Sequence, residues 1–258
     1  MSSLEHSTET LESTHGKIKE LYPTVDSYNV VREVDKYRNY WRPVKINVIL
    51  LAESHVYTSD EDFKIKIDYS SYEDLIPNYP DRYVRFVYCF GYAEHSLLKN
   101  ISSDKKLRLG TPQFWKIFSV CVSENGKFDF NSIKKTTTKT DERIKNKINL
   151  LNRLRKRGIW LVDGSIVGLY NEGEKPPSKV MKEILRISWE NYVKELVVNA
   201  KPKYIMCIGK FVRDTLKENI AETNIPFDYI HQPQAHLTSE EREKEYRKLQ
   251  KICSAYCA

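Results

Sequence analysis

The sequence of 258 residues predicts an α/β protein, a three-layer α/β/α fold with a central, mostly parallel sheet of four to five strands. Two observations predict this class. Short β-branched apolar runs alternate with longer amphipathic segments, as they do in units that place helices on both faces of a parallel sheet. The apolar runs also end abruptly in polar residues or glycine, which is typical of strands buried on both faces.

The first half of the chain predicts a helix over residues 15–40, a buried strand over 44–51, a second strand over 83–90 and a helix through Leu97 and Leu98. Residues 110–115 open a further helix, because Thr111 is a good helix cap and Pro112 suits the first helical position.

The second half predicts a basic helical stretch over residues 132–157, then a strand at 159–162, a helix at 178–199, a strand at 204–208, a helix from Phe211, a strand at 227–230 and a last helix from near Ser239. Gly158 is expected to end the basic helix. Ser239 begins a first turn rich in carboxylates, which favours a helix start there.

The domain prediction divides the chain into a polar tail and helix at residues 1–40 and one domain at 41–258, with a basic helical insertion at about 123–157. The polar, acidic first 16 residues resemble a frayed terminus more than a secretory signal. The mean hydropathy of -0.58 and the lack of a long apolar run predict no membrane span. Five cysteines, an odd number without a C-x2-C pair, favour free thiols, a cytoplasmic location and no metal. Nothing demands more than a monomer.

Several predicted strands end in residues that can carry chemistry. Glu53, Asp163, Gly209 and His231 each follow or close one of these strands. Because functional groups of such folds gather at the carboxyl ends of the strands, we expect these residues to share a site.

Four ordered segments between residues 44 and 240 resemble the uracil-DNA glycosylase superfamily. Ala52–Tyr57, read A-E-S-H-V-Y, resembles the first catalytic motif, which is written G-Q-D-P-Y-H in one family and G-E-A-P-G in another. The strand that ends in Asp163 is similar to the one whose terminal Asn reads uracil. Residues 204–211 resemble the strand-glycine-helix unit of the superfamily, and residues 229–233 resemble its H-P-S-P-type second motif. Phe86, five residues before Gly91, matches a stacking segment.

The resemblance implies a DNA glycosylase, which breaks an N-glycosidic bond and leaves an abasic site. A carboxylate stabilises the cationic sugar and orients water, and a donor stabilises the departing base. Glu53 matches the Glu of G-E-A-P-G, whereas Ser54 replaces the aspartate of the other motif. His231 is expected to face the base, with His236 as the alternative. Phe86 is expected to stack on the flipped-out ring, unless it is ordinary core and Phe90 or Tyr92 stacks instead.

Two departures from the family pattern bear on the substrate. Asp163 replaces the Asn, and a carboxylate only accepts hydrogen bonds, so it suits the exocyclic amine of cytosine better than O4 of uracil. Val56 replaces the Tyr that blocks substituents on C5. Together they predict a 5-modified cytosine, such as a hydroxymethylated or glucosylated one, and a role in defence against phages that carry such bases. The alternatives are a uracil or deaminated-base repair glycosylase, and a non-catalytic member that binds DNA or protein.

The net charge of +7 suits a polyanionic partner, and DNA is the partner that the resemblance implies. The residues expected to contact DNA are Lys134, Lys135, Lys139, Arg143, Lys147, Arg153 and Arg155, with Leu237 as a wedge in the duplex. A solvated helical face is the alternative interpretation of this basic stretch. The iron–sulfur cysteines of one family are absent, and hydrolysis by water needs no cofactor, so none is predicted.

Overall fold

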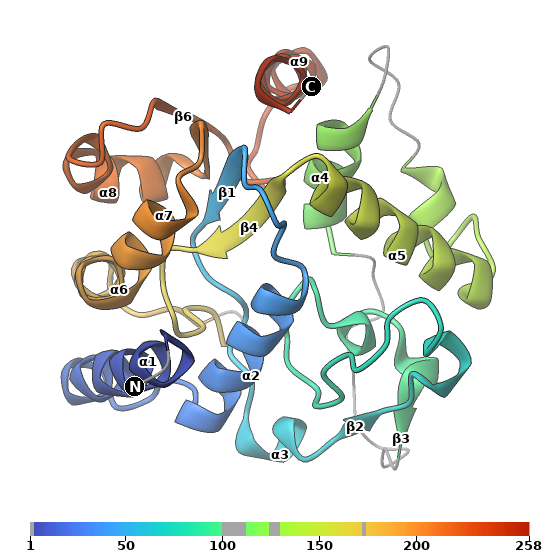
Figure 1. Ribbon diagram of the computed structural model, residues 1–258, viewed down its shortest axis with the longest axis horizontal. Helices are drawn as coiled ribbons and strands as arrows, with labels where there is room; N and C mark the ends of the chain where they lie inside the picture. The colour runs from blue at the N-terminus through green and yellow to red at the C-terminus, as the bar shows by residue number, and fades with distance from the viewer. Residues whose placement is uncertain (1–2, 100–111, 124–129, 172–173, 258) are drawn as a thin grey trace.

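The computed structural model describes residues 3–99, 112–123, 130–171 and 174–257. Its centre is a parallel four-stranded sheet of order β4-β1-β5-β6 (Figure 1). The strands are β1 (Val48–Ala52), β4 (Ile159–Asp163), β5 (Tyr204–Ile208) and β6 (Phe227–Ile230). Every residue of β1, β4 and β5 is buried, which explains their uninterrupted apolar sequence. The predicted three-layer α/β/α fold is confirmed, with four strands.

Successive residues of β1 face opposite layers, since side chains alternate along a strand. Ile49 and Leu51 pack against one set of helices, and Val48 and Leu50 pack against the other. The first layer consists of α1 (Ser3–Leu21), α6 (Ser178–Ser188), α7 (Lys194–Ala200) and α8 (Lys210–Ala221). A π-helical turn at Trp189–Val193 joins α6 to α7, so the single predicted helix of residues 178–199 is present as one continuous run.

The opposite layer contains α4 (Phe114–Val122), α5 (Thr140–Lys156), α9 (Ser239–Tyr256) and most of α2 (Tyr28–Tyr40). Residues 60–99 complete this layer with mostly irregular structure, in which α3 (Asp60–Phe63) and the antiparallel pair β2 (Lys66–Ile67) and β3 (Leu98–Lys99) are the regular elements besides short 3-10 turns. Figure 1 shows α4 and α5 together on the side of the sheet where α9 ends the chain.

Two predicted helix boundaries are confirmed by their capping geometry. Gly158 ends α5 with a φ of +73°, where a side chain would be strained and where a Cβ would approach Lys45 O to 2.5 Å. At the start of α9, Thr238 and Glu241 form a reciprocal capping box. The predicted cap Thr111 lies outside the described residues.

Four predicted elements were wrong. The single helix predicted over residues 15–40 is interrupted at residues 22–27, which separate α1 from α2. Residues 83–90 form no strand, because local bonds such as Phe86 N–H to Val84 O and Cys89 N–H to Phe86 O bend the backbone while the aromatic side chains pack in the core. Instead of a helix through Leu97 and Leu98, a 3-10 turn leads into β3. The expected frayed terminus is part of helix α1, which buries Leu11 and Ile18. None of the helices in the described ranges is long and apolar enough to span a membrane.

Candidate active site

Polar residues follow three of the four parallel strands at one edge of the sheet. Glu53 comes directly after β1, Asp163 ends β4 and His231 comes directly after β6. The strand order places β1 between β4 and β5, so the chain crosses from one side of β1 to the other on its way from β4 to β5. Ligands of open α/β sheets bind outside the carboxyl ends of the strands at such a switch point. The fold therefore favours a site at this edge.

A pocket of about 320 Å³ lies at the ends of β1 and β4. Three aromatic residues, Phe86, Tyr92 and Phe114, line it together with the carboxylate Asp163. We call it the aromatic pocket; its other lining residues are Ala52, Ser54, His55, Val56, Arg85, Val87, Pro112, Gln113, Leu161 and Gln234. Aromatic rings combined with a few polar groups are the usual lining of a site for a flat organic ligand.

His55 and Asp163 of this pocket belong to a buried cluster of charges. His55 Nε2 lies 3.1 Å from Asp26 Oδ2, and His55 Nδ1 lies 3.8 Å from Asp163 Oδ2. Arg38 Nη2 lies 3.5 Å from the same Asp163 oxygen. All four residues are at most 3% exposed. We call Asp26, Arg38, His55 and Asp163 the histidine cluster, which connects α2 and the loop before it to the ends of β1 and β4.

The imidazole of His55 is protonated at neutral pH. Burial lowers its pKa, but its contacts with Asp163 and Asp26 outweigh burial and raise the pKa to about 9. A protonated imidazole has two N–H donors. One is directed at Asp26, and Nδ1 has no hydrogen-bond partner within the described part of the chain. A buried N–H group in this state can donate a hydrogen bond to an acceptor atom of a ligand.

Asp26 is fixed in place by the backbone around it. Its Oδ1 accepts a hydrogen bond from Thr58 N–H at 2.6 Å, and its Oδ2 accepts one from Gly168 N–H at 2.5 Å. Gly168 permits the close approach, because a Cβ there would lie 2.5 Å from Tyr57 N. His55 is therefore oriented by a carboxylate that two loops hold rigidly.

A second pocket, of about 270 Å³, lies where β1, β5 and β6 end, and we call it the carboxylate pocket. Glu53 Oε1 accepts a hydrogen bond from Tyr170 Oη at 3.0 Å, and Oε2 accepts one from Gln232 Nε2 at 2.5 Å. Burial raises the pKa of Glu53 above its ordinary value, although these two hydrogen bonds and the charge of Lys175 act against it. The other lining residues are Ser178, Met181, Gly209, Lys210, Phe211, His231 and Ala235.

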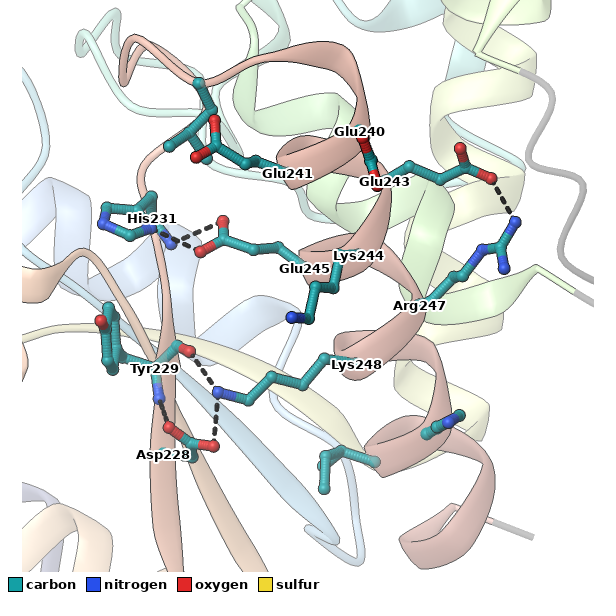
Figure 2. A pocket seen from close by; sticks show the side chains of 13 residues that line it. Asp228, Tyr229, His231, Glu240, Glu241, Glu243, Lys244, Glu245, Arg247 and Lys248 are labelled. Atoms are coloured by element: carbon teal, nitrogen blue, oxygen red, sulfur yellow. Dashed lines mark hydrogen bonds and ion pairs between the residues drawn. The ribbon is translucent and has the colours of Figure 1, made fainter.

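His231 is held by a carboxylate from α9. Its Nδ1 lies 2.5 Å from Glu245 Oε1, and its backbone N–H donates to Glu245 Oε2 at 3.0 Å. Figure 2 shows Glu245 extending from the helix toward the ring. This contact fixes the orientation of the ring and favours a proton on Nδ1. His231 lines both the carboxylate pocket and the surface groove in Figure 2.

The groove in Figure 2, about 970 Å³ in volume, lies between the edge strand β6 and α9. Its strand edge is already occupied by side chains, because Lys248 donates to Tyr229 O and Asp228 accepts from Tyr229 N–H. Side chains of both charge signs line the rest, with Leu237 at the loop. The edge of β6 is therefore protected against pairing with another strand.

The structure brings the four predicted base-binding residues together: Ser54, Val56, Phe86 and Asp163 all line the aromatic pocket. The predicted catalytic pair, Glu53 and His231, lines the carboxylate pocket instead. The expected single site is therefore divided between two pockets, of which one is lined by Glu53 and the other by the next residue, Ser54.

The alternative residues considered for stacking and for proton donation lie in different parts of the structure. Tyr92 lines the aromatic pocket, whereas Phe90 lies in the core and stacks on Tyr79. His236 is exposed, and Leu237 lies at the β6 groove away from the aromatic pocket's lining residues.

Arg143 and Lys147 were wrongly predicted to contact DNA. They are 4% and 0% exposed, because both turn inward from α5 toward Glu94. Arg143 Nη2 and Lys147 Nζ each lie 2.5 Å from a carboxylate oxygen of Glu94. The other predicted contact residues remain at the surface: Lys139, Arg153 and Arg155 are exposed, and Lys134 and Lys135 are half-buried.

The sequence analysis missed three residues of the site. His55 stands in the quoted first motif, and its place in a polar cluster at a strand end was a usable signal. Gln232 directly follows the predicted catalytic residue His231, and this position was its only signal in the sequence. Tyr170 carried no signal, since nothing in its loop indicated that it reaches Glu53.

In the part of the chain that the structure describes, no three His, Cys, Asp or Glu side chains are placed to hold a metal ion. Comparisons with protein-family models, curated proteins and solved structures found no match. A function must therefore be argued from the motifs of the sequence and the geometry of these two pockets.

Proposed function

We propose that the protein is a DNA glycosylase that hydrolyses the N-glycosidic bond of a flipped-out base and leaves an abasic site. The observation that carries the proposal is the aromatic pocket, whose rings and single carboxylate suit one nucleobase, beside the buried carboxylate of Glu53. Enzymes that act on a base place it between apolar or aromatic side chains and read its hydrogen-bonding edge. The motif resemblance between residues 44 and 240 supports the same activity.

Glu53 is the candidate for stabilising the sugar. Both of its oxygens accept hydrogen bonds from neutral donors, Tyr170 and Gln232, which hold the carboxylate in a fixed position. A fixed carboxylate stabilises positive charge that develops on the sugar as the bond to the base breaks. Each oxygen has further acceptor capacity, so Glu53 can also orient the attacking water.

Two adjacent polar groups of the aromatic pocket favour a cytosine-type base. Asp163 accepts, and it would pair with an exocyclic amine. The protonated His55 donates through Nδ1, and it would pair with the ring nitrogen N3 of cytosine, which accepts. Uracil presents the reverse pattern at these positions, which would leave buried groups unpaired at a cost of about 1–3 kcal/mol each.

The small side chain of Val56 lines the same pocket, which favours a base with a substituent on C5. We therefore propose a 5-modified cytosine, such as a hydroxymethylated or glucosylated one, as the substrate. Phage genomes that carry such bases are the proposed biological target, and the proposed partner is DNA acted on by a monomer.

The experiment compares oligonucleotides that differ at one position, which holds uracil, cytosine or a 5-modified cytosine, in single-stranded and duplex form. Abasic sites are revealed by alkaline cleavage. We expect release of the modified cytosine, loss of turnover with retained DNA affinity in Glu53→Gln, and unchanged release in the control Glu190→Gln, whose carboxylate is exposed. Base release from none of the substrates, or unchanged base release by Glu53→Gln, would contradict the proposal.

The variant Asp163→Asn tests the base assignment separately. An amide both donates and accepts, so it can pair with O4 and N3–H of uracil. We expect the preference to move from cytosine-type bases toward uracil. Release of uracil alone by the unaltered protein would replace the proposed base and leave the glycosylase activity standing.

A further inference from the structure

Three cationic side chains lie on the α4 and α9 side of the sheet, two of them over the half-buried ring of Phe130 and the third over the ring of Tyr246. Lys116 Nζ and Lys134 Nζ lie 5.4 and 5.2 Å from the centre of the Phe130 ring. Arg242, in the first turn of α9, is the third. Burial lowers the pKa of Lys116, and the charges of Lys134 and Arg242 lower it further, so the three positive charges act on one another. We call Lys116, Lys134 and Arg242 the cation cluster.

The cation cluster is not paired with carboxylates in the part of the chain that the structure describes. None of its three members takes part in an ion pair within the described residues. Lys134 donates to the amide oxygen of Asn131 at 3.1 Å, and the guanidinium of Arg242 donates to backbone carbonyls. All three are half-buried, so their mutual repulsion is screened less than between fully exposed groups. An anion bound from solution would relieve it.

The cation cluster borders the aromatic pocket. Arg242 donates to Gln232 O at 3.0 Å and to Ala235 O at 2.6 Å, and Gln234, which lies between these two residues, lines the pocket. The carboxylates near Arg242 in sequence, Glu240, Glu241 and Glu243, line the groove against β6 instead, as Figure 2 shows.

We propose that Lys116, Lys134 and Arg242 bind phosphates of the DNA backbone beside the nucleotide whose base enters the aromatic pocket. This inference rests on the proposed function, and it replaces the inward-facing Arg143 and Lys147 with a different contact surface. Each nucleotide of a DNA strand carries one phosphate charge, so several cations on one surface can contact successive phosphates. Backbone contacts fix the position of the nucleic acid and leave the choice of base to the pocket.

The experiment measures binding of the full chain to a fluorescent duplex by anisotropy over a series of salt concentrations. Each phosphate contact contributes about 0.9 to the slope of log affinity against log salt, so Lys116→Gln/Lys134→Gln should reduce the slope by about 2. The control, Lys182→Gln/Lys217→Gln, removes the same charge from exposed lysines of α6 and α8 in the opposite layer and should leave the slope nearly unchanged.

Thermal melting of each variant checks folding, and Lys134→Gln alone gives a milder version that should reduce the slope by about 1. An unchanged slope in both lysine variants, or an equal change in the control, overturns the cation cluster as the phosphate site. Absence of DNA binding by the unaltered protein overturns the proposed function itself. Binding with base release but an unchanged slope overturns the cation cluster alone.

Discussion

Two buried clusters of charged side chains differ in how completely they are paired. In the first, Glu94 accepts from Arg143 Nε at 2.9 Å and from Lys147 Nζ at 2.5 Å through Oε1, and from Arg143 Nη2 at 2.5 Å through Oε2. We call these three residues the glutamate cluster. In the second, the histidine cluster, His55 Nδ1 and Arg38 Nε have no hydrogen-bond partner among the described residues.

The difference separates a structural role from a functional one. The glutamate cluster joins α5 to the irregular layer beneath it and leaves both carboxylate oxygens satisfied. In the histidine cluster, His55 and Asp163 line the aromatic pocket, and His55 Nδ1 lies 3.8 Å from Asp163 Oδ2, beyond hydrogen-bond distance, although a buried donor without a hydrogen bond costs about 1–3 kcal/mol. A ligand could supply the missing hydrogen-bond partner of His55 Nδ1, so the incomplete pairing supports the proposed site in the aromatic pocket.

The largest expected effect is in the glutamate cluster. Glu94→Gln keeps the shape of the side chain but leaves the buried Arg143 and Lys147 without a counter-charge. Breaking a buried ion pair from one side destabilises a protein by about 3–5 kcal/mol. Urea unfolding followed by circular dichroism at pH 7 measures the loss.

The control for this variant is Asp141→Asn, which removes an exposed carboxylate of α5 whose partner Lys145 is also exposed. We expect it to change the free energy of unfolding far less. Equal losses in the two variants would show that the buried cluster has no special weight in the fold. Base release by Glu94→Gln below its melting temperature should stay normal, as a structural role requires.

The histidine cluster should show a smaller effect that depends on pH. The folded state raises the pKa of His55 from about 6.5 to about 9, so its stabilisation is full below pH 6.5 and is lost as pH rises through 9. A shift of this size corresponds to roughly 3 kcal/mol. We therefore expect the stability difference between the unaltered protein and His55→Gln to be largest near pH 6 and to shrink above pH 9.

The stabilisation by Glu94 depends on pH in the opposite direction, so it serves as a comparison for His55. Burial raises the pKa of Glu94, but the hydrogen bond from Arg143 and the charge of Lys147 outweigh burial and lower it. Its stabilisation is present above pH 4.5 and is lost as pH falls through the lowered pKa. A His55→Gln difference that is constant between pH 6 and 10 would contradict the protonated state assigned to His55.

Sequence periodicity predicted the sheet because its strands are buried on both faces and therefore uniformly apolar. The same reasoning failed at residues 83–90, since an aromatic run buried in irregular structure has the same composition as a buried strand. The ends of the predicted strands also indicated where the candidate site lies. Glu53 and Asp163 could be placed at one edge of the sheet from the sequence, because parallel strands align their carboxyl ends.

The contacts that decide the roles of these residues could not be predicted. Asp26 lies 29 positions before His55 in the chain, and Tyr170 lies 117 positions after Glu53. Positive charge alone also led to a wrong prediction. In the sequence Arg143 and Lys147 cannot be distinguished from the exposed basic residues of α5, because only the packing of this helix against Glu94 buries them. Pairing over such separations depends on tertiary structure, which local pattern does not contain.

Glu53 offers the smallest and most specific test, because neutral donors hold it where cations hold Glu94. Tyr170→Phe removes one of these donors, so the pKa of Glu53, already raised by burial, should rise further. The acid limb of the proposed base release should then move to higher pH by about one unit, since a hydrogen bond to a charged group contributes about 1.5–3 kcal/mol and exposure to the pocket weakens it. Rates measured across pH 4 to 8 follow the limb, and Tyr57→Phe, which alters a half-buried phenol outside the lining of both pockets, should leave it in place. A uniform loss of rate at every pH, with the limb unmoved, would mean that Tyr170 positions Glu53 without tuning its charge.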